Sequence, residues 1–584
     1  MRKVLIANRG EIAVRVAHTC AEVGIASVAI FADPDAEALH VRVADEAYSL
    51  EGQSVAETYL DADKILAIAK RCGADAIHPG YGFLAERREF AQAVIDAGLI
   101  WIGPAPQTIE LLGDKVAARE IAQRVGAPLV KGSAGNVPDA KTARRVAAEL
   151  GFPIAIKAAF GGGGRGMRVV HRLEDVEEAF DSAVRESEAA FGRGECYLEQ
   201  FLEKPRHVEA QVIADTHGNV YTLGTRDCSL QRRNQKLVEE APAPFLTADQ
   251  RELIERSARD ICRAAGYVGV GTVEYLLGAN GKISFLEVNT RIQVEHTVTE
   301  AVTGVDMVLA QLQIAAGKPV PVDDDLQPVG HAFQFRINAE DAGRGFLPAT
   351  GEIDVFDPPT GPGIRIDTGV HTDSVISGRY DSMLAKIIIW GISRKHAIRR
   401  ARRALKELRI RGITTVLPFH RAILEEPAFI SEDDFGVYTT WIEQEYASTL
   451  EADPQFRQAV PSQERVRMMI EIDGKNAKLG LPAAFMRALS AGGGSDPMAA
   501  LAGSVPDTHV NPAELRSPMA GTVLHVHVAE GDQVDEGAVV VVIEAMKTES
   551  PITAHRGGRV NDLQVAPGDS VSLDDLICHI EADD

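Results

Sequence analysis

The stretch TVEYLLGANGKISFLEVNTRIQVEH, residues 272–296, joins two apolar runs through a short turn and continues into a polar cluster. An Asn-Gly pair between apolar runs is the strongest local signal for a tight β-hairpin. A turn centred on Asn280 and Gly281 places Glu274 directly opposite Glu287. The sequence therefore predicts a β-hairpin with two carboxylates facing each other.

Facing carboxylates destabilise a pair of strands unless something neutralises them. A hard divalent cation with oxygen ligands is suited to that purpose. Asn289 lies two residues beyond Glu287, so it supplies a further oxygen on the same face of the strand. We therefore expect Mg²⁺ or Mn²⁺ at Glu274, Glu287 and Asn289. A solvated acidic hairpin face is the alternative.

The polar residues after this hairpin combine a guanidinium, an amide and a carboxylate. They are Arg291, Gln293, Glu295 and His296. Beside a metal, this combination can hold and deprotonate a small anion, although a structural ion pair between Arg291 and Glu295 explains the same spacing. Taken singly, Lys236 and His207 are expected at the surface.

A glycine run occupies residues 161–166, between the strand-like segments 154–158 and 167–170. Because glycines have no Cβ, such a loop can close over a polyphosphate with its backbone N–H groups. Lys157 adds a cation beside the same phosphates. The alternative is a flexible surface hairpin without a ligand.

Apolar runs at 4–7, 26–31 and 76–78, with helices such as 61–71 between them, predict an α/β layer with a parallel sheet. The following region is richer in strands, and a basic helix is expected near 393–409. We divide the chain into an N-terminal α/β domain (1–113), a middle domain (114–320) with a mobile lid at about 131–203, a third α+β domain (330–440), a linker (444–513) and a small all-β domain (514–582).

The small all-β domain contains an internal repeat. Residues 521–534 and 558–571 match at Gly, Val, Ala and Asp positions with a constant offset. Two similar β-halves are implied, and the sequence EAMK ending at Lys547 falls midway between them, at an exposed turn. The linker before this domain is rich in small residues and is expected to be mobile, with a possible hairpin at 471–482.

Composition limits the partners of the chain. Of its 584 residues, 45% are hydrophobic and 25% are charged, as in ordinary globular proteins. The net charge of −23 repels phosphate backbones and anionic membranes, so we expect neither nucleic acid nor membrane as a partner. An anionic nucleotide remains compatible, because a local cluster of cations can reverse the field inside a cleft.

The six cysteines are scattered and form no CxxC pair, so neither a disulfide framework nor a zinc site is expected. The N-terminus is too briefly apolar for a signal peptide, and no long apolar run follows it. We therefore expect a cytoplasmic protein.

Several motifs resemble those of biotin carboxylases and occur in the same order. They are IANRGEIA, HPGYGFLAE, GDK, FGGGGRGM, KPRHVEAQ, RDCSLQRRNQK, VEEAPAP, EVNTRIQVEH and FRINAED, within residues 1–440. The tail SPMAGTV followed by EAMK resembles a biotin carboxyl carrier domain. The arrangement is similar to the α-subunits of actinobacterial acetyl- or propionyl-CoA carboxylases.

The resemblance implies an ATP-grasp fold followed by a biotinyl or lipoyl type domain. It implies that ATP is bound by Lys115, Lys157, Gly162, Gly163, Gly164, Glu199, Gln200, Leu202, His207, Gln231 and Asn234. It also implies metal at Glu274, Glu287 and Asn289, and bicarbonate at Lys236, Arg291, Gln293 and the Val294 backbone. Glu295 would be the general base, Arg336 would stabilise negative charge on the biotin ureido group, and Lys547 would carry the biotin.

The implied activity is ATP-dependent carboxylation of biotin by bicarbonate through carboxyphosphate. The implied partners are a separate carboxyltransferase β-subunit in a hetero-oligomer and a biotin protein ligase. Three positions depart from the family pattern: Asn234, where His is frequent, Thr297 and Thr548. Two alternatives are a different ATP-grasp ligase fused to a β-domain, which would not need Arg336 or a carrier lysine, and a lipoyl or scaffold module in the tail.

Overall fold

The computed structural model describes residues 1–133, 135–159, 167–322, 326–456, 465–472, 475–482, 511–546, 548–571 and 574–582. Its first part is a five-stranded parallel sheet in the order β3-β2-β1-β4-β5. The strands are β1 (Lys3–Ile6), β2 (Ala26–Phe31), β3 (Glu46–Ser49), β4 (Ala76–His78) and β5 (Ile100–Trp101). The helices are α1 (Gly10–Glu22), α2 (Leu39–Val43), α3 (Ala62–Cys72), α4 (Arg88–Asp96) and α5 (Pro106–Gly113). The expected parallel α/β layer is confirmed.

The centre of the molecule is one eight-stranded sheet in the order β13-β12-β9-β10-β11-β14-β21-β19. Its strands are β9 (Arg206–Ala214), β10 (Val220–Arg232), β11 (Gln235–Ala241), β12 (Gly269–Leu277), β13 (Ile283–Asn289), β14 (His331–Asn338), β19 (Ile364–Thr368) and β21 (Met383–Gly391). The sheet crosses the two ranges expected as separate domains, because β11 pairs with β14. Strands far apart in sequence therefore share one face.

Helices cover this sheet. They are α6 (Lys115–Arg124), α9 (Ala248–Ala264), α10 (His296–Thr303), α11 (Met307–Ala315), α12 (Arg394–Glu407), α13 (Leu417–Ile423), α14 (Pro427–Ile430) and α15 (Ala447–Ala452). The basic helix expected near 393–409 is α12: Ala397, Ala401 and Leu405 are buried at helical spacing, whereas Arg399 and Arg403 face solvent.

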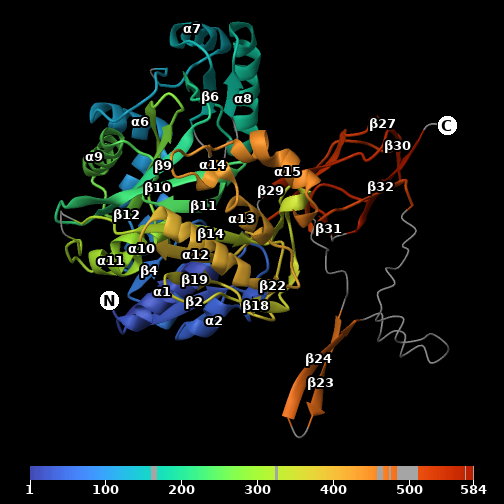
Figure 1. Cartoon of the computed structure of the whole chain (residues 1–584), viewed down its shortest axis with the longest axis horizontal. Coiled ribbons are helices and arrows are strands. Elements are labelled where there is room, and N and C mark those ends of the chain that lie inside the picture. The colour runs from blue at the N-terminus through green and yellow to red at the C-terminus, as the bar shows by residue number, and fades with distance from the viewer. Residues whose placement is uncertain are drawn as a thin grey trace.

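A three-stranded sheet, β7-β6-β8, projects from the upper end of the molecule in Figure 1. It contains β6 (Ile154–Ala158), β7 (Met167–Val170) and β8 (Cys196–Gln200), with α7 (Ala140–Leu150) and α8 (Val176–Phe191). The strands expected on each side of the glycine run are thus present. The run itself, with Gly162, Gly163 and Gly164, lies outside the described residues.

The third domain also contains short two-stranded ribbons. They are β15 (Glu340–Asp341) with β16 (Leu347–Pro348), β17 (Gly351–Glu352) with β20 (Val375–Ile376), and β18 (Val355–Asp357) with β22 (Arg409–Arg411). Tyr446, Leu450 and Phe456 are buried in the core of this domain. The folded part therefore extends beyond residue 444, where the linker was expected to begin.

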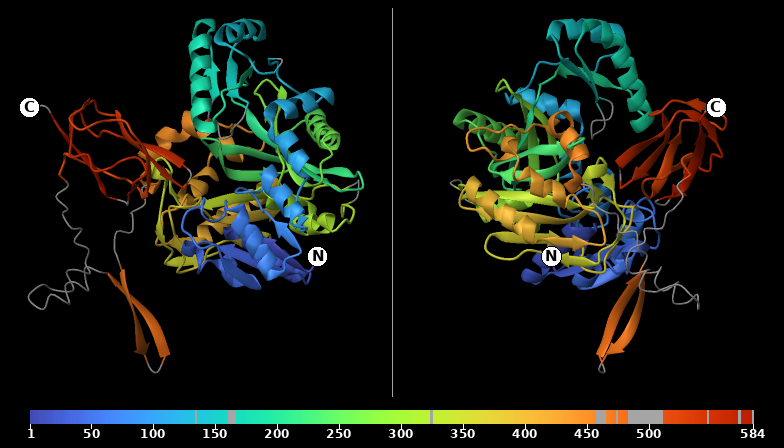
Figure 2. Two further views of the ribbon diagram at one scale, coloured as in Figure 1. Left: turned by 180° about the vertical axis from the view of Figure 1, so that it is seen from behind. Right: turned by 45° about the vertical axis from the view of Figure 1, so that its right-hand side comes forward.

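Within the linker, β23 (Arg465–Ile472) and β24 (Lys475–Pro482) form an antiparallel hairpin, longer than the one expected at 471–482. Figures 1 and 2 show this hairpin apart from the rest of the described chain. The Gly-rich part of the linker lies outside the described residues.

The C-terminal domain consists of two four-stranded sheets, β25-β32-β30-β27 and β29-β28-β26-β31. The strands are β25 (Glu514–Arg516), β26 (Gly521–Val526), β27 (Gln533–Val534), β28 (Val539–Ala545), β29 (Thr548–Thr553), β30 (Gly558–Asn561), β31 (Ser570–Val571) and β32 (Leu576–Glu581). The repeat predicted from sequence corresponds to β26 and β27 in one copy and to β30 and β31 in the other. The copies exchange strands, because β26 pairs with β31 and β27 pairs with β30.

Among the described residues, no helix combines the length and the apolar character that a membrane span requires.

Candidate active site

The β12–β13 hairpin places Glu274 opposite Glu287, as predicted. The turn is wider than the two-residue turn expected, however: Gly278 donates to the carbonyl of Lys282 at 2.8 Å, and the pairing near the turn is offset by one residue. A bulge next to Glu274 restores the expected register. Asn289 lies on the same face and donates through Nδ2 to Glu274 at 2.9 Å.

Lys236 lies at the centre of a cluster of buried carboxylates. Its Nζ is 2.8 Å from Glu209, 3.0 Å from Glu274 and 2.6 Å from Glu295. Strand β11 brings the lysine to this face, β9 and β12 supply two of the carboxylates, and Glu295 stands immediately before α10. Taken singly, Lys236 was expected at the surface. That expectation is wrong, because only 12% of its side chain is exposed.

His207 is also buried, although the residue taken alone suggested a surface position. Its Nε2 is 3.2 Å from Glu274 and 3.6 Å from Glu209. Burial opposes protonation of the imidazole, but the charge of Glu274 and the contacts with Glu209 and Glu274 together outweigh burial and raise the pKa of His207 to about 9. The ring is therefore a cation at neutral pH.

Arg336 reaches the same cluster from β14. Its Nε donates to Glu239 at 2.5 Å and its NH2 donates to Glu295 at 3.0 Å. Glu295 is thus held between an ammonium and a guanidinium. Burial opposes ionisation of Glu295, but Lys236 and Arg336 outweigh it and lower the pKa to about 2. The carboxylate is ionised at neutral pH and is aimed at both cations.

The polar residues after β13 point in several directions. Arg291 donates to Glu86 at 2.8 Å and to the Asn289 Oδ1 at 3.0 Å, so the structural pair with Glu295 that the spacing allowed is absent from the described residues. Gln293 donates to Glu274 at 2.8 Å. Arg291 and Gln293 therefore join the face of the two opposed glutamates.

The residues expected to contact nucleotide lie on both sides of this cluster. Lys115 is 3.5 Å from Glu287, and Lys157 forms a very short contact with Glu199, which also accepts from Arg119 at 3.0 Å. Leu202 is buried. The side chain of Gln200 donates to the Leu150 carbonyl at 2.7 Å.

Two further expected nucleotide contacts lie on the β10–β11 hairpin. Gln231 is buried and pairs in register with Lys236, so the structure brings it to the cluster. Asn234 is exposed in the turn of the hairpin, with a positive φ of 64° that asparagine tolerates better than most residues. Turn geometry therefore accounts for Asn234 without a ligand.

Single-residue reasoning missed several members of the cluster. Arg226 is fully buried and donates to Glu209 at 2.6 Å and to Gln293 at 2.9 Å. The signal available was alternation: His207, Glu209 and Gln211 occupy every second position of β9 and face the site together. Glu239, the partner of Arg336, lies on the neighbouring strand β11.

A second buried cation holds the backbone next to the cluster. Lys386 has no exposed surface; its Nζ lies 3.0 Å from Glu11 and donates to the Val294 carbonyl at 3.1 Å. Glu11 also accepts a very short hydrogen bond from Tyr81. Lys386 thereby fixes the backbone at Val294, immediately before Glu295.

The donor set fits a hard divalent cation. Glu274 and Glu287 are opposed across the hairpin, and Asn289 beside them carries a carboxamide oxygen that accepts from Arg291. These are the oxygen ligands that Mg²⁺ and Mn²⁺ prefer. His207, Glu209 and Glu274 also place ligand atoms within 4.8 Å of one another. The ammonium of Lys236 already lies against Glu209 and Glu274 of this second group. The group is therefore an ion-pair centre rather than a metal site.

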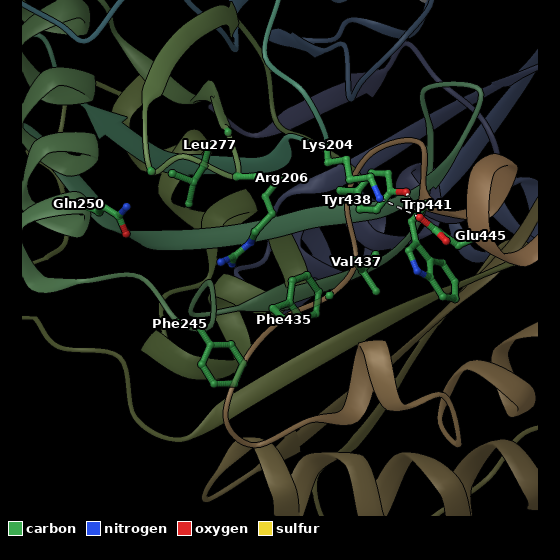
Figure 3. A pocket seen from close by; sticks show the side chains of 14 residues that line it. Lys204, Arg206, Phe245, Gln250, Leu277, Phe435, Val437, Tyr438, Trp441 and Glu445 are labelled. Atoms are coloured by element: carbon green, nitrogen blue, oxygen red, sulfur yellow. Dashed lines mark hydrogen bonds and ion pairs between the residues drawn. The ribbon is translucent and has the colours of Figure 1, made fainter.

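A cavity of about 500 Å³ lies elsewhere in the described part of the chain. Figure 3 shows Lys204 paired with Glu445 at its rim, and Phe435, Tyr438 and Trp441 in its wall. No described residue predicted to belong to the active site lines this cavity. Lys204 pairs with Glu445, and Arg206 pairs with Asp227 outside the cavity, so we assign the cavity no role.

In the C-terminal domain, Ala545 pairs with Thr548 across the turn that joins β28 and β29. Lys547 lies outside the described residues. Met546 just before it is buried and has a positive φ of 50°. The predicted strands on the two sides of the turn, β28 and β29, are therefore confirmed.

Fold and site together define an ATP-grasp carboxylase connected to a biotinyl-type carrier domain. Four family models match: biotin carboxylase N-terminal domain (1–109), carbamoyl-phosphate synthase L chain ATP binding domain (114–322), biotin carboxylase C-terminal domain (334–444) and biotin-requiring enzyme (513–580). The chain is 54% identical over 588 residues to the biotin-dependent acyl-coenzyme A carboxylase alpha3 subunit of Mycobacterium leprae, covering 99% of this chain and 98% of that protein. The chain belongs to the biotin-dependent carboxylase family, and it carboxylates biotin with ATP and bicarbonate.

Other relatives agree with this assignment. The biotin carboxylase of Nostoc is 48% identical over 73% of this chain and 96% of its own length. A biotin carboxylase structure from Campylobacter jejuni, in complex with an ATP analogue, has a TM-score of 0.73 at 40% identity and covers 76% of this chain and 98% of its own. The biotin carboxylase domain of a Hydrogenobacter thermophilus carboxylase, solved with MgADP and bicarbonate, has a TM-score of 0.72 at 42% identity and covers 78% and 99%. The expected fold class is confirmed.

Lys236→Met tests the charge balance of the cluster. The variant leaves three buried carboxylates around an apolar side chain, so we expect it to lose about 3 to 5 kcal/mol of unfolding free energy and to lose bicarbonate-dependent ATP cleavage. Denaturant unfolding and phosphate release measure the two effects. Lys204→Met, which removes a largely exposed pair with Glu445, is the control and should leave both the unfolding free energy and ATP cleavage close to wild type. Equal losses in both variants would contradict the central role of Lys236.

Proposed function

We propose that the polar cluster around Lys236 binds bicarbonate and directs its activation by ATP. Bicarbonate is a small anion, and three donors converge where it would lie. These are the ammonium of Lys236 and the amide of Gln293, which both donate to Glu274, and the guanidinium of Arg291, which donates to Asn289 beside it. The backbone N–H of Val294 would complete the site. The observation that carries the proposal is the position of Glu295, held at 2.6 Å from Lys236 and 3.0 Å from Arg336.

Glu295 is assigned as the general base. At neutral pH its carboxylate is ionised, which is the form that accepts a proton. An anion that binds to Lys236 draws the ammonium away from Glu295, and this weakens the interaction that lowers the pKa of Glu295. Substrate binding therefore increases the basicity of the residue that must remove the proton.

Arg336 is assigned to the second half of the reaction. Its guanidinium is fixed by Glu239 on one side and by Glu295 on the other. A planar guanidinium held in this way presents its remaining N–H groups in a defined direction. It would stabilise the negative charge that the ureido group of biotin acquires when it loses a proton.

The nucleotide is assigned to the region between the central sheet and the lid. The residues are Lys115, Lys157, Gly162, Gly163, Gly164, Glu199, Gln200, Leu202, His207, Gln231 and Asn234. Without nucleotide, Lys115 is paired with Glu287 and Lys157 is paired with Glu199, so neither lysine is an isolated charge. Each lysine would turn toward a phosphate when the nucleotide binds. Asn234 has the weakest support of the set because turn geometry explains it.

Glu274, Glu287 and Asn289 would hold Mg²⁺ or Mn²⁺. The ion would neutralise nucleotide phosphates during transfer of the γ-phosphoryl group to bicarbonate. The chain itself orients the ligands: Lys236, His207 and Gln293 fix Glu274, and Lys115 lies beside Glu287. Besides its place among the proposed nucleotide contacts, His207 positions Glu274, because its Nε2 lies 3.2 Å from that proposed ligand.

Biotin is assigned to Lys547, and its attachment requires a biotin protein ligase. Similarity to an acyl-CoA carboxylase α-subunit supports a separate carboxyltransferase β-subunit and a hetero-oligomer. That partner would transfer the carboxyl group to an acyl-CoA, and it would determine which acyl-CoA is used.

Glu295→Gln tests the base. The amide keeps the shape of the side chain but cannot accept the proton, so we expect kcat for bicarbonate-dependent ATP cleavage to fall by about 10² to 10⁴. KM for ATP should change little, because the side chain of Glu295 contacts Lys236 and Arg336 rather than a proposed nucleotide contact. Glu252→Gln, at a largely exposed residue of α9, is the control. An unchanged kcat would exclude Glu295 as the base.

Lys547→Arg tests the carrier lysine. After co-expression with a biotin ligase, the wild-type chain should show the mass increment of one biotin, whereas the variant should show none. Lys395→Arg, an exposed lysine on α12, is the control and should retain the increment. Intact-protein mass spectrometry measures both, and a biotinylated Lys547→Arg chain would place the biotin on another residue.

The division of labour is tested with the purified chain and radiolabelled bicarbonate. Alone, the chain should cleave ATP when bicarbonate and free biotin are present but should transfer no label to acetyl-, propionyl- or longer acyl-CoA. Addition of a carboxyltransferase β-subunit should start that transfer. Acyl-CoA carboxylation by the chain alone would refute the proposed need for a partner.

A further inference from the structure

Glu199 is a buried carboxylate with two cationic partners. Lys157 forms a very short contact with its Oε1, and the NH1 of Arg119 donates to its Oε2 at 3.0 Å. Only 10% of the Glu199 side chain is exposed, and both cations are also largely buried. One carboxylate is therefore shared by two positive charges in a region with little solvent to screen them.

The two cations come from different elements. Lys157 stands on β6, diagonally across from Glu199 of β8 and on the same face of the sheet. Arg119 stands on α6, four residues after Lys115, so both side chains leave the same face of the helix. Because Lys115 lies 3.5 Å from Glu287, this face of α6 borders the region proposed for the nucleotide.

A second hydrogen bond fixes the position of Arg119. Its NH2 donates to the Val130 carbonyl at 2.6 Å. Two residues further on, Gly132 pairs with Glu199, and a Cβ at Gly132 would lie 2.8 Å from the Arg119 NH2 and 2.9 Å from a backbone carbonyl of β8. The missing side chain at Gly132 lets the guanidinium lie close to the strand. Arg119 is thus held beside Glu199 by contacts that do not involve Lys157.

Lys157 must leave Glu199 before it can reach a nucleotide phosphate. Burial opposes the charge of Lys157, but Glu199 and Tyr197 outweigh burial and raise the pKa of this lysine, so it is an ammonium at neutral pH. If Glu199 had no other partner, the departure of Lys157 would leave a buried carboxylate without a counter-charge, which is strongly unfavourable. With Arg119 in place, Glu199 stays paired after Lys157 has moved.

We propose that Arg119 is a positioning residue for nucleotide binding, because it stays with Glu199 when Lys157 turns from that carboxylate to a phosphate. The inference rests on the proposed assignment of Lys157 to the nucleotide. Arg119 itself contacts no substrate and acts through Glu199. A guanidinium suits this task, since it is always protonated and its separate N–H groups bind the Glu199 carboxylate and the Val130 carbonyl at the same time.

Arg119→Met tests this role, with Arg124→Met as the matched control at an exposed arginine of the same helix. In Arg119→Met we expect KM for ATP to rise about tenfold, because Glu199 then holds Lys157 as its only counter-charge. The dissociation constant of a non-hydrolysable ATP analogue should rise equally. Both kcat and KM for bicarbonate should stay within about twofold of wild type. Arg124→Met should resemble wild type in every measurement, and an unchanged KM for ATP in Arg119→Met would overturn the proposal.

Two further comparisons separate charge from packing. Arg119→Lys keeps the cation, so KM for ATP should stay within about threefold of wild type, whereas a rise as large as in Arg119→Met would reject the counter-charge. In a Glu199→Gln chain, Arg119→Met should cause no further rise, because a neutral amide does not hold Lys157. A rise of the same size in that chain would show that Arg119 does not act through Glu199. Arg119→Gln, which is neutral but still donates a hydrogen bond, gives the same test if the methionine variant does not fold.

Lys157→Met distinguishes failure of this inference from failure of the proposed function. If Lys157→Met leaves KM for ATP unchanged, the nucleotide is not bound by Lys157, and Arg119 loses its role as well. If Lys157→Met raises KM for ATP while Arg119→Met does not, only the inference about Arg119 is wrong. Elevated values in both variants, with the Glu199→Gln chain insensitive to Arg119→Met, would support both assignments.

Discussion

The ammonium of Lys236 is the interaction on which the site depends. Three carboxylates, Glu209, Glu274 and Glu295, converge within hydrogen-bonding distance of one nitrogen, and all three are buried. Without a cation at that point, burial would drive protons onto these groups or separate the strands that carry them. Neutrality at this centre lets the sheet close, and it also leaves ionised carboxylates available for chemistry. The fold and the proposed catalysis therefore require the same ion pairs.

The central sheet explains how distant residues meet. Pairing of β11 with β14 places Arg336 beside Glu239, and Glu295 then bridges Arg336 and Lys236. Arg226 links Glu209 on β9 to Gln293 beyond β13. Lys386 fixes the Val294 carbonyl from the neighbouring strand β21. Each reactive group is thus held by a residue on another strand, so the geometry of the site follows from the register of the sheet.

Local sequence patterns predicted the hairpin, the parallel layer and the repeat, because each depends on residues close together in the chain. The opposed pair Glu274 and Glu287 was correct, although a bulge compensated for a turn wider than expected. Burial of Lys236 and His207 could not be inferred from either residue alone, since it arises from long-range strand pairing. The same holds for Glu239 and Lys386. The resemblance to a family supplied the residues that we propose to react, whereas only the structure showed which side chains hold them.

The strand exchange within the carrier domain has a consequence for its assembly. Each repeat contributes its first strand to one sheet and its last strand to the other, so neither copy possesses a complete sheet of its own. The two halves are consequently obligate complements, and loss of either dismantles both layers at once. The turn between β28 and β29 emerges from this interlock, and it acquires its shape only when the whole domain has folded. An enzyme that modifies the carrier domain by recognising the shape of that turn would therefore act only on a completely folded domain.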